Sequence, residues 1–266
     1  MKCRICSNEP AFAFRSVVLG QHDVAYYSCG RCGYLQTETP FWLAKAYAES
    51  ISETDTGIMA RNLVLSRIAA TLILTRLDRN GVFLDFAGGY GIFVRLMRDL
   101  GFDFFWSDRY ARNLLARGFE FAPADGNRKA ELITALEIFE HFVEPLEEIG
   151  RMVQMSGNIL FSTTLVPDPP PPPDSWWYYA PEHGQHIGFY QHKTLKWIAS
   201  HFGMNLCSNR KNLHLLTTGG IGDSFFRSMI IPGAATGGIL SRLVMKSRSE
   251  TDMSLMVASR RGDTRR

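Results

Sequence analysis

Short apolar runs alternate with helix-like patterns through the middle of the chain. The runs are bounded by Gly, Pro or Asp, as expected of buried parallel strands, and they cover residues 82–86, 102–107, 131–136 and 159–163. Apolar residues recur at helical spacing in 92–100, 114–117, 145–157 and 193–202. This alternation predicts an α/β fold, a Rossmann-like, doubly wound and mostly parallel sheet.

The pattern is less regular after residue 203. Segments 213–217 and 253–258 resemble strands, and we expect them to form a final antiparallel pair. An insert near 222–250 combines apolar residues with Arg and Lys. The plainer interpretation of this insert is a lid or dimer element. The alternative is docking on a membrane surface that carries a lipid-linked glycan.

Four cysteines lie within the first 32 residues. Cys3 and Cys6 form one C-x-x-C pair, and Cys29 and Cys32 form a second pair after a spacer of 22 residues. Two such turns aim four thiolates at one point, which is the ligand set of structural Zn²⁺. Strand-like residues in the spacer suggest a zinc ribbon, in which the metal stabilises the module and takes no part in catalysis. The alternatives are four unrelated buried thiols or two disulfides.

Composition and charge narrow the range of partners. The 266 residues are 45% hydrophobic and 21% charged, with a formal net charge of +3, which does not favour nucleic acid as a partner. We expect a cytoplasmic protein without a transmembrane span, because neither a signal peptide nor a long apolar segment is visible. The expected domains are a zinc module at 1–40, a helical connector at 41–80 and an α/β domain at 81–266.

A glycine-rich loop follows the first strand of the α/β domain. Asp85, Ala87, Gly88, Gly89 and Gly91 lie in the segment between this strand and the next helix, where small residues let a ligand approach the backbone. Asp108 follows Gly91 by 17 residues at the end of the second strand, a place from which a carboxylate accepts hydrogen bonds from ribose hydroxyls. The loop lacks the G-x-G-x-x-G spacing and the Walker lysine, so a dinucleotide or phosphate-transfer loop is not indicated.

The segment from Asp85 to Gly91 resembles motif I of the class I S-adenosylmethionine-dependent methyltransferases, D-x-G-x-G-x-G, with Ala87 in place of the first glycine. Residues 131–145 are similar to the family's fourth-strand segment, with Glu131 replacing the usual aspartate. The resemblance implies that the loop residues line the methionine end of S-adenosylmethionine and that Asp108 binds its ribose. It further implies that Asp125 approaches the adenine and that Leu136 and Glu137 lie beside the cofactor.

Candidate catalytic groups follow the fifth strand. His183, next to Glu182, is the first choice of general base and His186 is the second, while Tyr179 lies in the same segment. The alternative is that the two histidines fix the loop, and a metal site at His183 and His186 lacks an evident third ligand. Glu140 and His141, in the fourth-strand segment, are interpreted as a local hydrogen-bonding pair that fixes a loop, with direct chemistry as the alternative.

The cysteine module, the methyltransferase motifs and the Tyr179–His183 segment together resemble the zinc-containing sugar C-methyltransferases. This resemblance implies a sugar, nucleotide sugar or glycan acceptor from polysaccharide or antibiotic biosynthesis. In that family the tyrosines and the histidine of this segment take part in deprotonating the sugar. The chain ends where those enzymes continue into a further domain, so O-methylation of a glycan hydroxyl fits equally well. The rival functions are a non-catalytic protein that holds the cofactor and an RNA methyltransferase.

Overall fold

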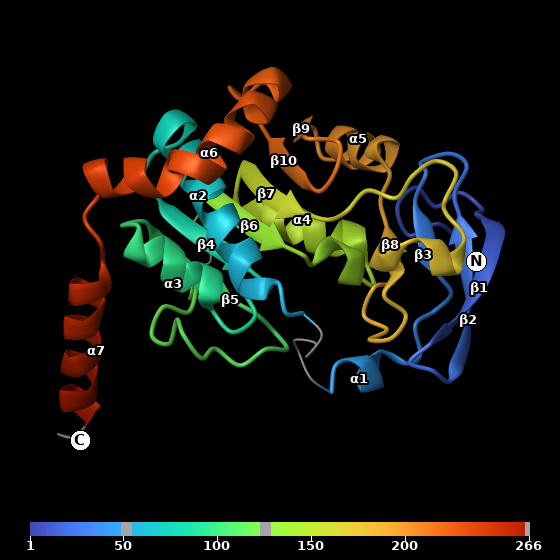
Figure 1. Ribbon diagram of the computed structural model, residues 1–266, viewed down its shortest axis with the longest axis horizontal. Coiled ribbons are helices and arrows are strands. Elements are labelled where there is room, and N and C mark those ends of the chain that lie inside the picture. Colours follow the sequence, from blue (N-terminus) through green and yellow to red (C-terminus); the bar gives the residue numbers. More distant parts are fainter. Residues whose placement is uncertain (49–54, 123–128, 264–266) are drawn as a thin grey trace. The chain divides into compact units, whose positions relative to one another are not determined.

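The computed structural model describes residues 1–48, 55–122 and 129–263 (Figure 1). The chain divides into two compact units. The first unit combines Met1–Thr54 with Ala135–Asp223, and the second combines Asp55–Thr134 with Ser224–Arg266. Each unit is therefore built from segments that are distant in the sequence.

The second unit contains the first strands of the predicted α/β pattern. Its elements are α2 (Ile58–Arg76), β4 (Val82–Phe86), α3 (Ile92–Asp99), β5 (Asp103–Ser107), the start of β6 (Leu132–Leu136), α6 (Asp223–Val244) and α7 (Ser249–Asp263). Strand β4 pairs in parallel with β5 and with β6. The rings of Phe83 and Phe104 stack at 5.1 Å between centroids, and both side chains are fully buried. Apolar side chains on adjacent parallel strands thus form the core that holds the loop after β4.

The first unit contains a small antiparallel sheet and the remaining strands of the larger one. The small sheet has the order β1-β2-β3-β8, from β1 (Ala11–Val18), β2 (His22–Ser28), β3 (Leu35–Thr37) and β8 (Gly188–Phe189). The other strands are β7 (Asn158–Ser162), β9 (Asn205–Ser208) and β10 (Leu213–Thr217). The helices are α1 (Leu43–Ala46), α4 (Pro145–Met155) and α5 (His192–His201), with 3₁₀ turns η1 (Phe139–His141), η2 (Pro173–Ser175) and η3 (Trp177–Tyr179).

The larger sheet has the strand order β5-β4-β6-β7-β10-β9. Its β5-β4-β6 part is parallel, whereas β10 pairs antiparallel with both β7 and β9. Five predicted strands, including 213–217, are therefore present within one or two residues at each end. Helix α4 begins at Pro145, where the missing N–H of proline costs no helical hydrogen bond.

The segment 114–117 is not a helix, so that prediction was wrong. The backbone N–H groups of Leu114 and Leu115 both donate to the carbonyl oxygen of Tyr90, at 3.2 and 3.0 Å. The Asn113 side chain accepts a hydrogen bond from the N–H of Ala116 at 2.9 Å. A segment this short cannot nucleate a helix alone, and these contacts hold it as a loop against the start of α3.

The segment 253–258 is not a strand, because it lies inside helix α7. Acidic residues in the first turn, Glu250 and Asp252, favour the helix start electrostatically. The Asp252 carboxylate also binds the buried Arg98 guanidinium through two contacts of 2.7 and 2.8 Å. A six-residue apolar run is compatible with a strand or with a helix. The ion pair that holds α7 is made by a residue outside this run, so the run gives no sign of it.

Helix α2 is the one single helix in the described part of the chain whose length and apolar composition would allow a membrane span. In the most apolar 18-residue stretch of α2, 39% of the residues are buried. Helices α6 and α7 are long and apolar enough only when they are taken together, and they are bent by 67° relative to one another. Helices that pack in the core of a soluble domain have the same composition, so this finding is weak evidence of a span.

Candidate functional site

The loop between β4 and α3 has a backbone that requires small residues. Ala87, Gly89 and Gly91 all have positive φ angles, of 55°, 53° and 84°. A side chain at Gly88 would place its Cβ 2.7 Å from the Asp85 carboxylate and 2.9 Å from the Trp106 ring. The predicted glycine motif is therefore a tight turn that leads directly into α3, with Gly91 as the N-cap residue of that helix.

Asp108 is joined to this loop. One of its carboxylate oxygens accepts a hydrogen bond from the N–H of Gly89 at 3.0 Å. The other oxygen accepts from the N–H groups of Tyr110 and Ala111, at 2.7 and 2.8 Å. A carboxylate has about four lone-pair sites, so capacity remains for a hydroxyl group of a ligand. The second unit thus brings Asp108 and the glycine loop together, as the sequence predicts.

Asp85 is a buried acid at the end of β4. Its side chain accepts a hydrogen bond from the Thr134 hydroxyl at 2.6 Å and is 3% exposed. Burial raises the pKa of Asp85 to about 7, and the negative charge of Asp108 acts in the same direction, whereas the Thr134 bond opposes it. A positively charged ligand at this point would stabilise the ionised carboxylate.

Two further cofactor candidates belong to the first unit, and one lies outside the described residues. Glu137 has a positive φ of 53°, and its N–H donates to the Ser162 hydroxyl at 2.9 Å. The Ser162 hydroxyl in turn donates to the Glu137 carboxylate. Leu136 is the last residue of β6. Asp125 is among the residues that the structure does not describe.

A cluster of ionisable side chains lies in the first unit. Turn η1 carries Glu140 and His141, and the loop after η3 carries His183 and His186. The Glu140 carboxylate is fully buried, and one of its oxygens lies 3.9 Å from His141 Nε2 and 4.0 Å from His186 Nε2. The His186 ring centroid lies 5.0 Å from that of His141 and 4.8 Å from that of His183. We call Glu140, His141 and His186 the Glu-His-His cluster.

Hydrogen bonds orient the two imidazoles of the Glu-His-His cluster. His186 Nδ1 lies 2.6 Å from the carbonyl oxygen of Tyr178, and a carbonyl accepts only, so Nδ1 carries the proton. The Nε2 atom of neutral His186 therefore carries no proton. It is the basic nitrogen of the ring and lies on the side of Glu140. His141 Nδ1 forms a hydrogen bond of 2.8 Å with the Tyr47 hydroxyl. Burial lowers the pKa of both histidines, which keeps their rings neutral near pH 7.

The other predicted catalytic residues have different surroundings. His183 Nδ1 accepts the backbone N–H of Gln185 at 3.2 Å, so the proton of the neutral ring is on Nε2. Glu182 is exposed to solvent. Tyr179 is buried among aromatic rings and donates its hydroxyl proton to the carbonyl oxygen of Pro171 at 2.8 Å. The structure thus brings His183 and His186 together but places Tyr179 in the apolar core of the first unit.

The sequence leaves direct chemistry at Glu140 and His141 only as an alternative, and it predicts no role for Tyr47. Glu140 precedes His141 in the fourth-strand motif, and this adjacency was the one local signal for the pair. Tyr47 is 94 residues from its hydrogen-bonding partner, so no spacing rule connects them.

The four N-terminal cysteines converge as their spacing predicts. The Sγ atoms of Cys3 and Cys32 lie 3.5 Å apart, as do those of Cys6 and Cys29, and all four lie within 4.8 Å of one another. These separations exceed the ~2.05 Å of a disulfide but match the ~3.8 Å edge of a tetrahedron with Zn–S bonds of ~2.3 Å. The strand-like spacer forms the antiparallel hairpin of β1 and β2, which joins the two C-x-x-C turns. The donor set and its size therefore suit a tetrahedral metal ion.

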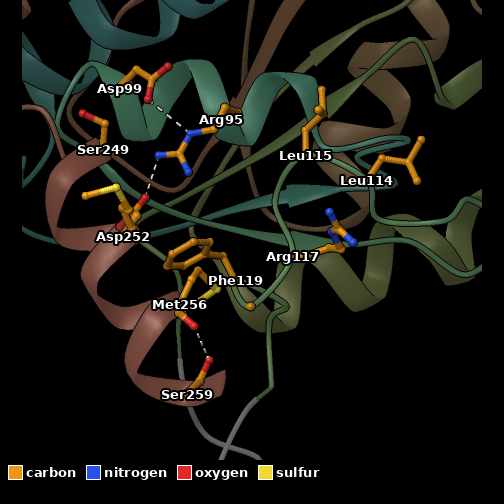
Figure 2. A pocket seen from close by; sticks show the side chains of 12 residues that line it. Arg95, Asp99, Leu114, Leu115, Arg117, Phe119, Ser249, Asp252, Met256 and Ser259 are labelled. Atoms are coloured by element: carbon orange, nitrogen blue, oxygen red, sulfur yellow. Dashed lines mark hydrogen bonds and ion pairs between the residues drawn. The ribbon is translucent and has the colours of Figure 1, made fainter. Parts of the chain in front are cut away.

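A cavity of about 590 Å³ lies in the second unit between α3, the loop 114–119 and α7. Figure 2 shows Arg95 at its wall, bound to Asp99 at 3.2 Å and to Asp252 at 2.6 Å. Because none of the predicted site residues lines this cavity, we assign it to the packing of α7 and not to the candidate active site.

Comparison with protein families gives one match over more than half of the chain. A family model described as a methyltransferase domain matches residues 59–209. No curated protein matches this chain.

Several solved structures are similar to this chain at low sequence identity. The first is CalO1, a methyltransferase in calicheamicin biosynthesis, with 15% identity over 67% of this chain and 60% of that one, at a TM-score of 0.44. Magnesium protoporphyrin IX methyltransferase from Synechocystis PCC 6803 shows 14% identity over 65% and 87% of the two chains, at 0.39. TnmH shows 13% identity over 68% and 62%, at 0.48. This chain spans less than two thirds of CalO1 and of TnmH.

Proposed function

Since this chain belongs to the methyltransferase-domain family and is an S-adenosylmethionine-dependent enzyme, we propose that its acceptor is a sugar, a nucleotide sugar or a glycan. The observation that carries this proposal is the bare Nε2 of His186 in the buried Glu-His-His cluster. A hydroxyl or an activated sugar carbon must lose a proton during methylation, and a neutral, oriented imidazole is suited to activate such a group.

We assign S-adenosylmethionine to the loop after β4. The small residues Gly88, Gly89 and Gly91 let a ligand approach the backbone of the turn, and Asp108 offers lone pairs for ribose hydroxyls. Asp85 supplies a carboxylate that a cationic ligand would hold in its ionised form. When bound, the cofactor supplies an electrophilic methyl group on a sulfonium sulfur. Ala87, Leu136, Glu137 and Asp125 complete the proposed cofactor set.

We assign activation of the acceptor to His186. Its Nδ1–H is held by the Tyr178 carbonyl, so the ring cannot turn its basic nitrogen away from the cluster without losing that bond. Glu140 lies within 4.0 Å and stabilises positive charge that develops at the imidazole. His183 lies beside this ring, whereas Glu182 and Tyr179 lack a comparable orientation. Both C- and O-methylation are compatible with this arrangement.

We further propose that Cys3, Cys6, Cys29 and Cys32 hold one structural Zn²⁺ in a zinc ribbon. The support is the size of the sulfur tetrahedron and the position of the hairpin between the two cysteine pairs. Four thiolates leave no open coordination position, so the metal would stabilise the module. The limits 1–40, 41–80 and 81–266 and a cytoplasmic location are part of the same proposal.

The proposal is tested by the variant His186→Ala with His201→Ala as the control, since His201 is a solvent-exposed histidine of α5. Radiolabelled S-adenosylmethionine is supplied with a panel of nucleotide sugars and glycans, and cofactor binding is measured separately by calorimetry. We expect His186→Ala to lower turnover by about 10² to 10⁴-fold, the usual contribution of an acid–base group, with cofactor affinity unchanged. Full activity of His186→Ala, or no methylation of any sugar by the wild type, would contradict the proposal.

A further inference from the structure

Two groups of at least three possible metal ligands occur among the described residues. One is the cysteine tetrahedron. The other is the Glu-His-His cluster, whose ligand atoms all lie within 4.8 Å of one another. Two imidazole nitrogens and one carboxylate form a donor set that suits Zn²⁺, Fe²⁺ and neighbouring divalent ions. This second group needs an explanation of its own, because its donors differ chemically from the four thiolates.

The distances in the Glu-His-His cluster are close to those of a metal centre. Metal–ligand bonds of ~2.1 Å place neighbouring ligands ~3.0 Å apart and opposite ligands ~4.2 Å apart. The Glu140 carboxylate oxygen lies 3.9 Å from His141 Nε2 and 4.0 Å from His186 Nε2, within this range. Side-chain rotations that move the ligand atoms by under ~1 Å would close the remaining separation.

The second ring nitrogen of each histidine is held as it is in metal centres. Histidine ligands almost always use their other nitrogen in a hydrogen bond that fixes the ring and its tautomer. Here His186 Nδ1–H donates to the Tyr178 carbonyl at 2.6 Å, and His141 Nδ1 bonds the Tyr47 hydroxyl at 2.8 Å. Both Nε2 atoms, and not the Nδ1 atoms, are therefore the ones directed at Glu140.

Hydrogen bonds to backbone carbonyls connect the two segments that carry the cluster. The carbonyl oxygen of Glu140 accepts the N–H of Ile187 at 2.9 Å, which joins η1 to the residue after His186. The Tyr190 hydroxyl donates to the carbonyl oxygen of Phe139 at 2.9 Å, one residue earlier. Two chain segments about 46 residues apart are thereby held in a constant register. Such preorganisation is what a metal centre built from separate segments requires.

We propose that Glu140, His141 and His186 bind one divalent transition-metal ion, in addition to the metal of the cysteines. Three protein ligands leave coordination positions open, unlike the closed cysteine site. An oxygen of the acceptor occupies such a position, and the metal acts on it as a Lewis acid. This role for the open positions rests on the proposed function, whereas the binding of the metal does not. With the metal bound, His186 acts on the acceptor as a metal ligand and not as its base, and the metal lowers the pKa of the acceptor hydroxyl so that its proton passes to solvent.

The test is calorimetric titration of the full-length protein, already loaded with zinc at its cysteines, with Co²⁺. Wild type should bind one further equivalent, and its absorption spectrum should lack thiolate-to-cobalt charge-transfer bands. His186→Ala and His141→Ala should each weaken binding by more than ~100-fold, and Tyr47→Phe by about 10- to 100-fold, the usual range for a group behind a ligand. His201→Ala should bind Co²⁺ as the wild type does.

Two results would overturn the metal site. One is a wild-type protein that takes up no Co²⁺ beyond the cysteine centre. The other is His186→Ala and His141→Ala proteins that bind Co²⁺ as tightly as wild type. Glu140→Gln keeps the shape of the side chain and gives a second test if an alanine variant does not fold. Turnover lost in His186→Ala with metal binding unchanged would overturn the metal site and leave the proposed function in place.

Discussion

The glycine loop and the Glu-His-His cluster are built in different ways. In the loop, Gly89 and Asp108 are 19 residues apart and are joined through a single strand, helix and strand. In the cluster, Glu140 and His141 come from turn η1 and His186 comes from the loop after η3, while His141 bonds Tyr47 from 94 residues away. The first site is a local motif, and the second exists only once several segments have folded together. Local spacing therefore predicts the glycine loop, whereas in the cluster it identified His186 but not the contacts that His186 and His141 make with Glu140 and Tyr47.

The largest expected effect is a loss of cofactor affinity, caused by a substitution in the glycine loop and not in the Glu-His-His cluster. Gly88→Val places a side chain into Asp85 and Trp106, so we expect S-adenosylmethionine affinity to fall by about 100-fold or more, equivalent to roughly 3 kcal/mol. Gly219→Ala is the matched control, because a Cβ there meets nothing within 4 Å. Calorimetry measures the affinity and circular dichroism verifies folding. Unchanged affinity in a folded Gly88→Val protein would contradict the assignment of the loop.

A second effect, of about tenfold, concerns pH. The pKa of Asp85 is raised to about 7, so its carboxyl is mostly protonated at pH 6 and mostly ionised at pH 8. A cationic cofactor prefers the ionised form, so affinity should rise with pH and increase by about tenfold from pH 6 to pH 8. Asp85→Asn should bind more weakly at pH 8 and lose this dependence. Calorimetry at several pH values measures both, and a dependence that persists in Asp85→Asn would assign it to another group.

The smallest expected effect tests whether Tyr179 belongs to the proposed acceptor site. Tyr179→Phe removes the hydrogen bond to the Pro171 carbonyl, so we expect the free energy of unfolding to fall by about 1 kcal/mol. Turnover should remain within about twofold, because Tyr179 packs in the aromatic core of the first unit. Urea denaturation and the methyl-transfer assay measure the two quantities. A large loss of turnover in a stable protein would return Tyr179 to the catalytic set.

Short-range patterns in the sequence predicted most strands and the two local motifs. Pro145 and the apolar run of 82–86 identify their elements because helix starts and buried strands depend on neighbouring residues. The predictions for 114–117 and 253–258 were wrong because the structure of these segments depends on contacts with distant residues. Leu114 and Leu115 are bound to Tyr90, and Asp252 beside the second segment is bound to Arg98, 154 residues away. These contacts have no counterpart in local spacing.

The sequence by itself determined where four thiols and a glycine turn would form, because C-x-x-C turns and the loop after a strand fold from a few adjacent residues. Only the tertiary structure decided which histidine has an unprotonated Nε2 atom. That choice depends on the Tyr178 carbonyl at His186 and on the positions of Glu140 and Tyr47. The tautomer of an imidazole is set by its hydrogen-bonding partners, and those partners meet only when the segments that carry them pack together.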